Sequence, residues 1–412
     1  MPESRDTIAI VTGVPLATNP RAWKEAATLA AAGYRVRVLG GWTSVTSAER
    51  DRALANRLGF ALTLVGERAS GATRLWRRAR VRAAGELQRL TGMQTRHRLG
   101  YLVPELQAAA LSAKADLYSL HTEQAVWVGR VLKRIGRQIM VDMEDWHSED
   151  LPPDALHPRA LLRSLERELL RDAVATSCPS ETMSNTLSQE YNCAPPQVIY
   201  NAFAWADRVR MDASRRDRQD PALASLHWHS QTVGPRRGLE CLMSALPHLV
   251  APLEIHLRGE SVPAYRAELL RNVPPEWRAR VFFHAGVPNE ELLSRIAEHD
   301  IGYAGEEAAI RSRDVTVTNK ILHDLLGGLA IIATPTQGQA EVARRAKGAI
   351  QLCEAATPQA VAGALNRFLL ERSHLAAAQT AALHAAEREF CWERQAPKLL
   401  RSVELALAQR AQ

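Results

Sequence analysis

Apolar residues follow two patterns that alternate along most of the chain. Short apolar runs are typical of strands buried on both faces of a sheet. Segments with apolar residues at helical spacing lie between several of these runs, for example residues 289–299 and 358–370. The alternation predicts parallel sheets covered by helices, which is an α/β fold. The expected strands are residues 7–12, 34–39, 61–65, 116–120, 139–142, 175–178, 226–230, 253–257, 281–284, 301–304 and 329–333.

The length of 412 residues suits two domains better than one hydrophobic core. Residues 201–224 are polar and charged, and we interpret them as an interdomain linker between two series of strands and helices. The expected domains are residues 1–205 and 206–385. We expect residues 386–412 to form a helix that packs back on the N-terminal domain.

The stretch 316–338 combines a helix, a strand and a loop. Thr318 or Asn319 can cap the helix, and Lys320 lies in its first turn. Two glycines end the helix, and a buried strand follows. Residues 334–338 then form a loop at the carboxyl end of that strand, where open α/β sheets bind ligands. The stretch is compatible with an anion site at a helix start, and also with an ordinary helix–strand unit whose lysine is solvated.

Composition restricts the environment and the partners. The formal charge of +7 favours anionic partners such as nucleotide phosphates and acidic lipids. The five cysteines are scattered, which argues against a disulfide framework and against a zinc site. The N-terminus has no charged-then-apolar leader, and no run of about 18 apolar residues suggests a membrane span. We therefore expect a cytoplasmic protein.

Residues 68–98 form a strongly basic segment. Nine arginines accompany a single acid, Glu86, and a partial apolar stripe runs through the same stretch. A basic amphipathic helix of this kind can lie on an anionic membrane surface, on the inner face of the cell membrane. The alternatives are a solvated arginine-rich face, or arginines paired with acids elsewhere in the fold. No nucleic-acid-binding module accompanies the arginines, so nucleic acid is not an expected partner.

Several short stretches together resemble a known family. They are NPRAWKEAATLAAAGYRVRVL, ADLYSLHTE, IMVDMED, VIYNAF, GPRRGLECLMSAL and NKILHDLLGGLAIIATPTQGQAEV. In this order they resemble the retaining GT-B glycosyltransferases that build bacterial cell-surface polysaccharides and glycolipids. The resemblance implies two doubly wound Rossmann-like domains facing a central cleft. It also implies transfer of a hexose, without metal or cofactor, from a nucleotide diphosphate sugar to a lipid-linked or saccharide hydroxyl.

The resemblance assigns roles to individual residues. Arg237 and Lys320 would neutralise the departing diphosphate, and His121 would lie beside the donor sugar. Without the family context, His121 would be read as a hydrogen-bonded core histidine. Uridine diphosphate is the first choice of nucleotide because it prevails in the family. The further donor-binding positions are Gly13, Gln231, Arg236, Val315, Thr316, Thr318, Asn319, His323 and Asp324, and those on the acceptor side are Asn19, Arg21, Glu144 and Asp145.

The sequence departs from the family pattern at several of these positions. His323 stands where a glutamate usually binds the ribose, and Val315 where the family's other glutamate stands. Gln231 replaces a frequent arginine, and Met143 replaces a histidine beside Glu144, which could then be structural. Two further hypotheses therefore stay open. One is a nucleotide-sugar 2-epimerase-like enzyme, which would not need the basic segment. The other is a degenerate GT-B subunit that binds a sugar or supports a partner enzyme.

Overall fold

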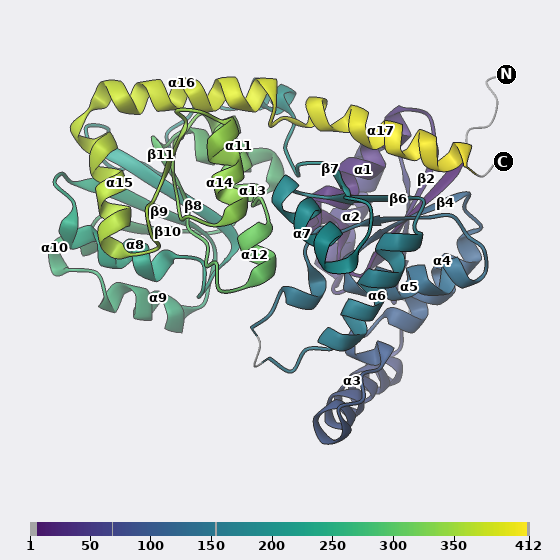
Figure 1. The fold of residues 1–412 in the computed structure, drawn as a ribbon. Coiled ribbons are helices and arrows are strands. Elements are labelled where there is room, and N and C mark those ends of the chain that lie inside the picture. Colours follow the sequence, from purple (N-terminus) through teal and green to yellow (C-terminus); the bar gives the residue numbers. More distant parts are fainter. Residues whose placement is uncertain (1–5, 68, 153–154, 410–412) are drawn as a thin grey trace. The chain divides into compact units, whose positions relative to one another are not determined.

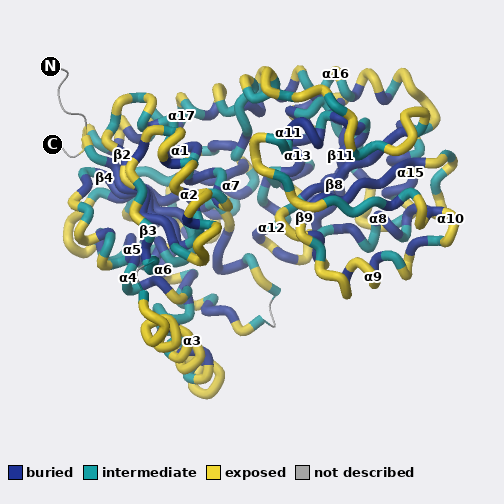
Figure 2. Tube along the Cα trace, turned by 180° about the vertical axis from the view of Figure 1, so that it is seen from behind, coloured by how far each residue is buried: buried dark blue, intermediate teal, exposed yellow. Residues whose placement is uncertain are grey.

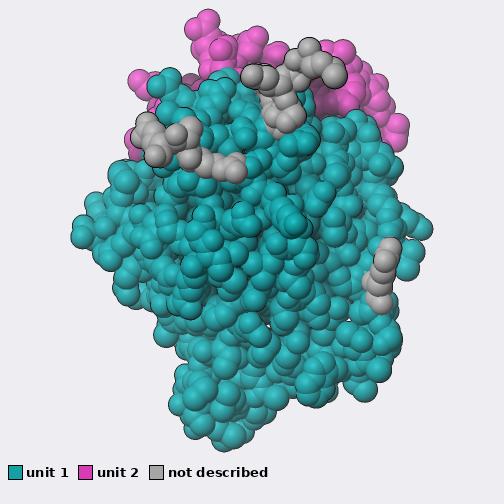
Figure 3. All heavy atoms as spheres, turned by 90° about the vertical axis from the view of Figure 1, so that its right-hand side faces the viewer, with its two compact units in different colours: residues 1–199, 396–412 teal, residues 200–395 magenta. Residues whose placement is uncertain are grey.

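The computed structural model describes residues 6–67, 69–152 and 155–409, and these divide into two compact units (Figures 1 and 3). Unit 1 contains the described residues up to Ile199 and those from Ala396 onward. Unit 2 is Tyr200–Gln395. Each unit is built around one parallel sheet. The expected α/β fold with two doubly wound sheets is confirmed.

The sheet of unit 1 has the order β3-β2-β1-β4-β5-β6-β7, and its strands pair in parallel. Its central strands are almost entirely buried because helices cover both faces. Most sequence-predicted strand positions are reproduced to within one or two residues. The strands are β1 (Thr7–Thr12), β2 (Arg35–Gly41), β3 (Ala61–Val65), β4 (Leu117–His121), β5 (Ile139–Asp142), β6 (Ala175–Cys178) and β7 (Gln197–Val198).

The helices of unit 1 begin and end at residues suited to these positions. Asn19 caps the first helix by accepting from the backbone N–H of Ala22, and Pro20 occupies its first turn. The helices are α1 (Pro20–Ala31), α2 (Val45–Leu58), α3 (Gly71–Thr91), α4 (Val103–Ala113), α5 (Thr122–Arg134), α6 (Arg159–Asp172) and α7 (Glu181–Tyr191). Helix α3 projects from the rest of unit 1, and much of its surface is exposed (Figures 1 and 2).

The sheet of unit 2 has the order β10-β9-β8-β11-β12-β13, again with parallel pairing. Its core includes Trp228, Tyr303 and Phe368, which are all buried. The strands are β8 (Ala224–Val233), β9 (Leu253–Ser261), β10 (Val281–His284), β11 (Ile301–Ala304), β12 (Ala330–Ala333) and β13 (Ile350–Leu352). The helices are α8 (Leu239–Ala245), α9 (Pro263–Arg271), α10 (Pro275–Arg278), α11 (Asn289–Ala297), α12 (Arg311–Val315), α13 (Asn319–Gly327), α14 (Gln337–Arg345), α15 (Pro358–Leu370) and α16 (Arg372–Arg388). The last helix, α17 (Trp392–Ala408), begins in unit 2, and its residues from Ala396 onward belong to unit 1.

Two sequence interpretations were wrong in detail. Residues 201–224 are not a free linker, because they pack on unit 2 through ion pairs such as Asp212–Arg295 and Asp217–Arg258. Residues 334–338 are only partly a loop, since α14 begins at Gln337 after the cap residue Thr336. In both places we interpreted charged or polar residues as signs of a loop. The structure shows that some of them bind buried residues elsewhere in unit 2, for example Asp217 with Arg258 and Thr334 with Glu306.

Candidate functional site

The carboxyl ends of β1 and β4 form the first candidate site. The strand order of unit 1 reverses between these two strands, and ligands of open α/β sheets bind at such a reversal. Gly13 follows β1, and its backbone N–H donates to the Thr122 hydroxyl at 3.0 Å. Thr122 has a φ of 78°, an unusual value for a β-branched residue. The chain therefore turns sharply just after His121, the last residue of β4.

His121 lies between two carboxylates. Its Nε2 is 2.9 Å from Glu25 Oε2, and its Nδ1 is 2.7 Å from Glu144 Oε1. Asn19 donates from its side-chain amide to both oxygens of Glu144, at 2.8 and 3.1 Å. The His121 side chain is fully buried, whereas that of Glu144 is 16% exposed. Within unit 1, Glu144 is thus the member of this network that reaches the surface.

The charges in this network stabilise one another. Burial lowers the pKa of His121, but Glu25 and Glu144 outweigh burial and raise it well above its usual range. Burial raises the pKa of Glu144, but hydrogen bonds from His121 and Asn19 lower it overall. We therefore describe His121 as an imidazolium that donates to both carboxylates. The hydrogen-bonded core histidine is thus confirmed, whereas the role of His121 beside a donor sugar stays a prediction.

Arg21 and Asp142 form a second buried pair beside His121. Arg21 Nε is 2.7 Å from both oxygens of Asp142, and Nη1 donates to the carbonyl of Ile199 at 2.5 Å. Both side chains are almost fully buried. Arg21 therefore holds together the α1, β5 and β7 regions of unit 1. The exposed Asp145 follows this region in the chain.

Sequence reasoning missed Glu25. A signal was present, because Arg21, Glu25 and Leu29 are spaced by four residues and share one face of α1. Two charged residues that continue an apolar helix face indicate a buried ion network.

The carboxyl ends of β8 and β11 form the second candidate site, where the strand order of unit 2 reverses. The basic turn with Arg236 and Arg237 follows β8 and leads into α8. Gly238 ends this turn with a φ of 72°, and an added Cβ there would lie 2.9 Å from Gly305 Cα. Only glycine fits this conformation and contact without strain, so the turn lies tightly against the end of β11.

Lys320 is in the first turn of α13. In a parallel α/β sheet the helices run antiparallel to the strands, so the start of α13 lies at the carboxyl edge of the sheet. Its Nζ forms an ion pair with Glu306, and both side chains are largely buried. The Thr334 hydroxyl in turn links to the backbone N–H and carbonyl of Glu306. Sequence reasoning missed Glu306, although its place directly after β11 was a usable signal.

The structure places the remaining donor-side positions in different environments. His323 is almost buried and stacks on Phe203, with ring centroids 3.3 Å apart. Val315 and Asp324 are buried, and the aliphatic side chain of Val315 has no polar atom to offer a ligand. The others are at or near the surface. Gln231 and Arg236 are exposed, Arg237, Thr316, Thr318 and Asn319 are half-buried, and Asn319 accepts from Asn201 at 2.8 Å.

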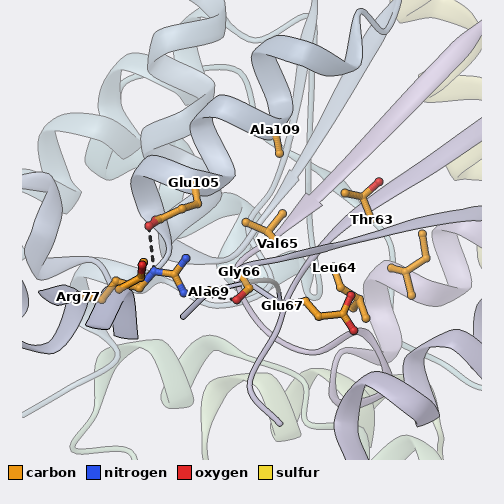
Figure 4. A pocket seen from close by; sticks show the side chains of 11 residues that line it. Thr63, Leu64, Val65, Gly66, Glu67, Ala69, Arg77, Glu105 and Ala109 are labelled. Atoms are coloured by element: carbon orange, nitrogen blue, oxygen red, sulfur yellow. Dashed lines mark hydrogen bonds and ion pairs between the residues drawn. The ribbon is translucent and has the colours of Figure 1, made fainter. Parts of the chain in front are cut away.

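A pocket lies elsewhere in unit 1, beside the edge strand β3. Its lining includes residues 62–67, Thr73 and Ala109, and Arg77 donates across it to Glu105 at 2.9 Å (Figure 4). In the sheet order, β2 and β1 separate β3 from β4, which carries His121. The pocket is therefore distinct from the site at the strand reversal.

The arginines of the basic segment divide into two groups. Arg77 and Arg80 pair with Glu105, as the pairing hypothesis expected. Arg96 and Arg98 instead donate to neutral acceptors, the side chains of Gln107 and Gln88 and the carbonyl of Leu156. A second group is exposed on α3 together with large apolar side chains, and Trp76 is 66% exposed. Arg68 lies outside the described residues. The exposed group is Arg74, Arg78, Arg82 and Arg89, with Leu75, Trp76 and Leu90.

Comparison with known proteins relates the N-terminal part of the chain to a family. Residues 17–202 match the sequence profile of the glycosyl transferase 4-like domain. The resemblance drawn from the sequence is confirmed at that level, and the retaining stereochemistry stays a prediction. No curated protein gives a significant sequence match to the chain.

Solved structures of similar fold extend the comparison to both units. Sucrose-phosphate synthase from Thermosynechococcus elongatus has 13% identity and a TM-score of 0.71, covering 98% of this chain and 100% of that one. HepE from Anabaena in complex with UDP has 16% identity and a TM-score of 0.67, covering 97% and 99%. A putative UDP-N-acetylglucosamine 2-epimerase from Listeria monocytogenes has 10% identity and a TM-score of 0.58, covering 97% and 96%. The chain thus has the GT-B fold, which is common to both reaction classes.

Among the described residues, no helix is both long and apolar enough to cross a membrane.

Proposed function

We propose that this protein is a retaining glycosyltransferase that moves a hexose from a nucleotide diphosphate sugar to a lipid-linked or saccharide acceptor. The observation that carries the proposal is the placement of Arg237 and Lys320 at the strand reversal of unit 2. A departing nucleoside diphosphate gains negative charge in the transition state. Preorganised cationic donors at that position stabilise the charge without a metal ion.

The ion pair between Glu306 and Lys320 suggests how the lysine would bind the donor. In the protein alone, Glu306 neutralises Lys320 and holds its amine at the start of α13. A diphosphate carries more charge than one carboxylate, and it would compete with Glu306 for the lysine. Lys320 would then exchange or share its partner when the donor binds. Support for a uridine nucleotide comes from HepE, whose structures include complexes with UDP and UDP-glucose.

In unit 1, we propose that Glu144 contacts the substrate directly and that His121 acts as a positioning residue. His121 has both ring nitrogens bonded to carboxylates and no exposed surface, whereas Glu144 is partly exposed. The imidazolium keeps Glu144 ionised and fixed in orientation. An ionised carboxylate can accept hydrogen bonds from sugar hydroxyls.

The exposed face of α3 supports a peripheral membrane association for an enzyme with a lipid-linked acceptor. Exposed arginines attract acidic headgroups, and Leu75, Trp76 and Leu90 can enter the interface. This surface is also the feature that distinguishes the proposal from the 2-epimerase alternative, because an epimerase acts on the nucleotide sugar alone.

One experiment tests the proposed activity against both alternatives. Purified full-length protein would be incubated with nucleotide sugars one by one, with and without saccharide and lipid acceptors. Acceptor-dependent release of nucleoside diphosphate, with the donor's anomeric configuration kept in the product, is expected. A new 2-epimer of the nucleotide sugar would instead identify an epimerase. Binding of a nucleotide sugar without any product would identify a non-enzymatic subunit.

A further inference from the structure

A group of histidines fills the interior of unit 2. His227 and His229 alternate on β8 and therefore face the same side of the sheet, where α13 contributes Asp324. One ligand atom from each of these three residues lies within 4.8 Å of the other two, and all three residues are buried. The residues come from chain positions about a hundred residues apart, and only the fold brings them together.

The polar atoms of this group lack hydrogen-bond partners within the described part of the chain. They are both ring nitrogens of His227, Nδ1 of His229 and Oδ1 of Asp324. The distance of 3.9 Å between His229 Nδ1 and Asp324 Oδ1 is too long for a hydrogen bond. Each buried polar atom without a partner costs about 1–3 kcal/mol, so several in one place call for a bound species.

The backbone leaves room for the Asp324 carboxylate at this point. Gly302 on β11 pairs with His227 on β8. A Cβ added to Gly302 would lie 2.5 Å from Asp324 Oδ2, so any side chain there would displace the carboxylate. Glycine at this position thus lets the carboxylate approach the sheet beside the two imidazoles.

Two other groups of potential ligands differ from this one. The group of Glu25, His121 and Asp142 is already occupied by protein partners, because Arg21 binds Asp142 and His121 binds Glu25. In the group of Asp217, Glu298 and His299, arginines bind both carboxylates. Among the described residues, no arginine or lysine forms an ion pair with the ligand atoms of the His227 group.

We propose that His227, His229 and Asp324 bind one divalent transition-metal ion. Two imidazoles and one carboxylate are ligands that zinc takes in proteins, and zinc is therefore the ion used in the test below. Three atoms within 4.8 Å of one another leave an ion at their centre at most about 2.8 Å from each. Side-chain shifts of about 0.7 Å then give zinc bonds of about 2.0–2.1 Å.

The ion would connect β8 to the middle of α13, one helical turn after Lys320. This role is structural, since a site enclosed in the interior fixes the position of the helix rather than contacting a substrate. The proposal does not depend on the glycosyltransferase assignment.

The test uses tag-free, full-length protein that has been treated with a chelator and then titrated with Co²⁺. We expect one equivalent to bind with the visible ligand-field absorption of a low-coordinate site, and Zn²⁺ to displace it. Zinc at 100 times its dissociation constant should raise the melting temperature by about 5 °C or more. Wild-type protein that binds no Co²⁺ and shows no thermal shift with zinc would overturn the proposal.

Variants locate the ion. His227→Leu and Asp324→Asn should each lose the cobalt absorption and the thermal shift. His256→Gln is the matched control, because His256 is buried in the same unit but bonds to His284 and Glu254. The control should keep both signals. Binding that persists in the first two variants, that is lost equally in the control, or that shows the charge-transfer band of cysteine ligation would refute this site.

Discussion

The two units each bury histidines at the centre of a parallel sheet, but they satisfy them in different ways. In unit 1, carboxylates contact both nitrogens of His121. In unit 2, neither nitrogen of His227 has a partner among the described residues. The buried histidine of unit 1 therefore receives its partners from the protein itself. The proposed metal ion would supply the partner that the buried histidine of unit 2 lacks.

The largest expected effect contrasts His121→Leu with His227→Leu in metal-free protein. Removing His121 leaves Glu25 and Glu144 without their cation, which should cost about 3–5 kcal/mol of unfolding free energy. Removing His227 breaks no hydrogen bond, so its cost should stay below about 1 kcal/mol. Urea unfolding of both variants would measure the difference. Equal costs would show that the two clusters are equivalent.

The next effect concerns the proposed diphosphate site of unit 2. Lys320→Ala and Arg237→Ala should each reduce turnover by about 100-fold, as expected for the loss of one preorganised donor. Arg271→Ala is the matched control, because this exposed arginine at the end of α9 lies outside the proposed site and should leave turnover within about twofold. Steady-state kinetics with folding checked by circular dichroism would decide. Near-normal rates in both test variants would remove the proposed diphosphate site.

The exposed face of α3 in unit 1, which we propose binds a membrane surface, gives a further contrast. Each exposed arginine near an acidic bilayer contributes about 1 kcal/mol. Replacing both Arg78 and Arg82 by alanine should therefore weaken binding to phosphatidylserine vesicles by roughly 30-fold. Replacing the buried Arg77 by alanine should instead lower the stability of the fold, because Arg77 pairs with Glu105. Sedimentation with vesicles at increasing salt would show whether binding falls steeply, as electrostatic docking requires. Binding that does not depend on salt would return α3 to the solvated-face interpretation.

The two units should respond to pH in opposite directions. The raised pKa of His121 stabilises unit 1 fully below about pH 6.5, and this contribution is lost as the pH rises through the folded-state value. Burial, with His299 and His284 nearby, lowers the pKa of His256 to about 2, although Asp217 acts in the opposite direction.

Unit 2 should therefore lose stability as the pH falls from about 6.5 toward 2, by up to about 1.4 kcal/mol per pH unit for this residue. Amide hydrogen exchange, corrected for intrinsic rates and resolved by unit, would measure both trends. If the stability of both units changed with pH in the same direction, the opposite pKa shifts given for His121 and His256 would be wrong.

The smallest effect concerns His323. If His323 binds the ribose, His323→Ala should weaken nucleotide binding by about fivefold, the equivalent of one hydrogen bond. Phe203→Leu removes the stacked ring but keeps the imidazole, and it should change affinity less. Calorimetric titration of both variants with UDP would distinguish them. Unchanged affinity in His323→Ala would mean that His323 only packs.

The sequence predicted the fold more closely than the site. Buried strands are continuous apolar runs, and helix ends carry local signals such as Asn19 and Gly328, so the elements could be read from short windows. The positions of His121 at the end of a strand and of Lys320 at the start of a helix could be predicted from the same local signals. Their partners Glu25 and Glu306 did not, because a glutamate on a helix or in a loop is usually solvated.

The group of His227, His229 and Asp324 could not be predicted from the sequence, because its members come from distant parts of the chain. Closely spaced cysteines are the usual sequence sign of a zinc site, whereas Asp324 joins His227 and His229 only when β8 and α13 pack together. The pattern of residues along the chain determined the secondary structure and the two sheets, and it carried the resemblance to a glycosyltransferase family. The tertiary structure alone decided which buried charges have partners, because pairing depends on which distant side chains share a space that water cannot enter.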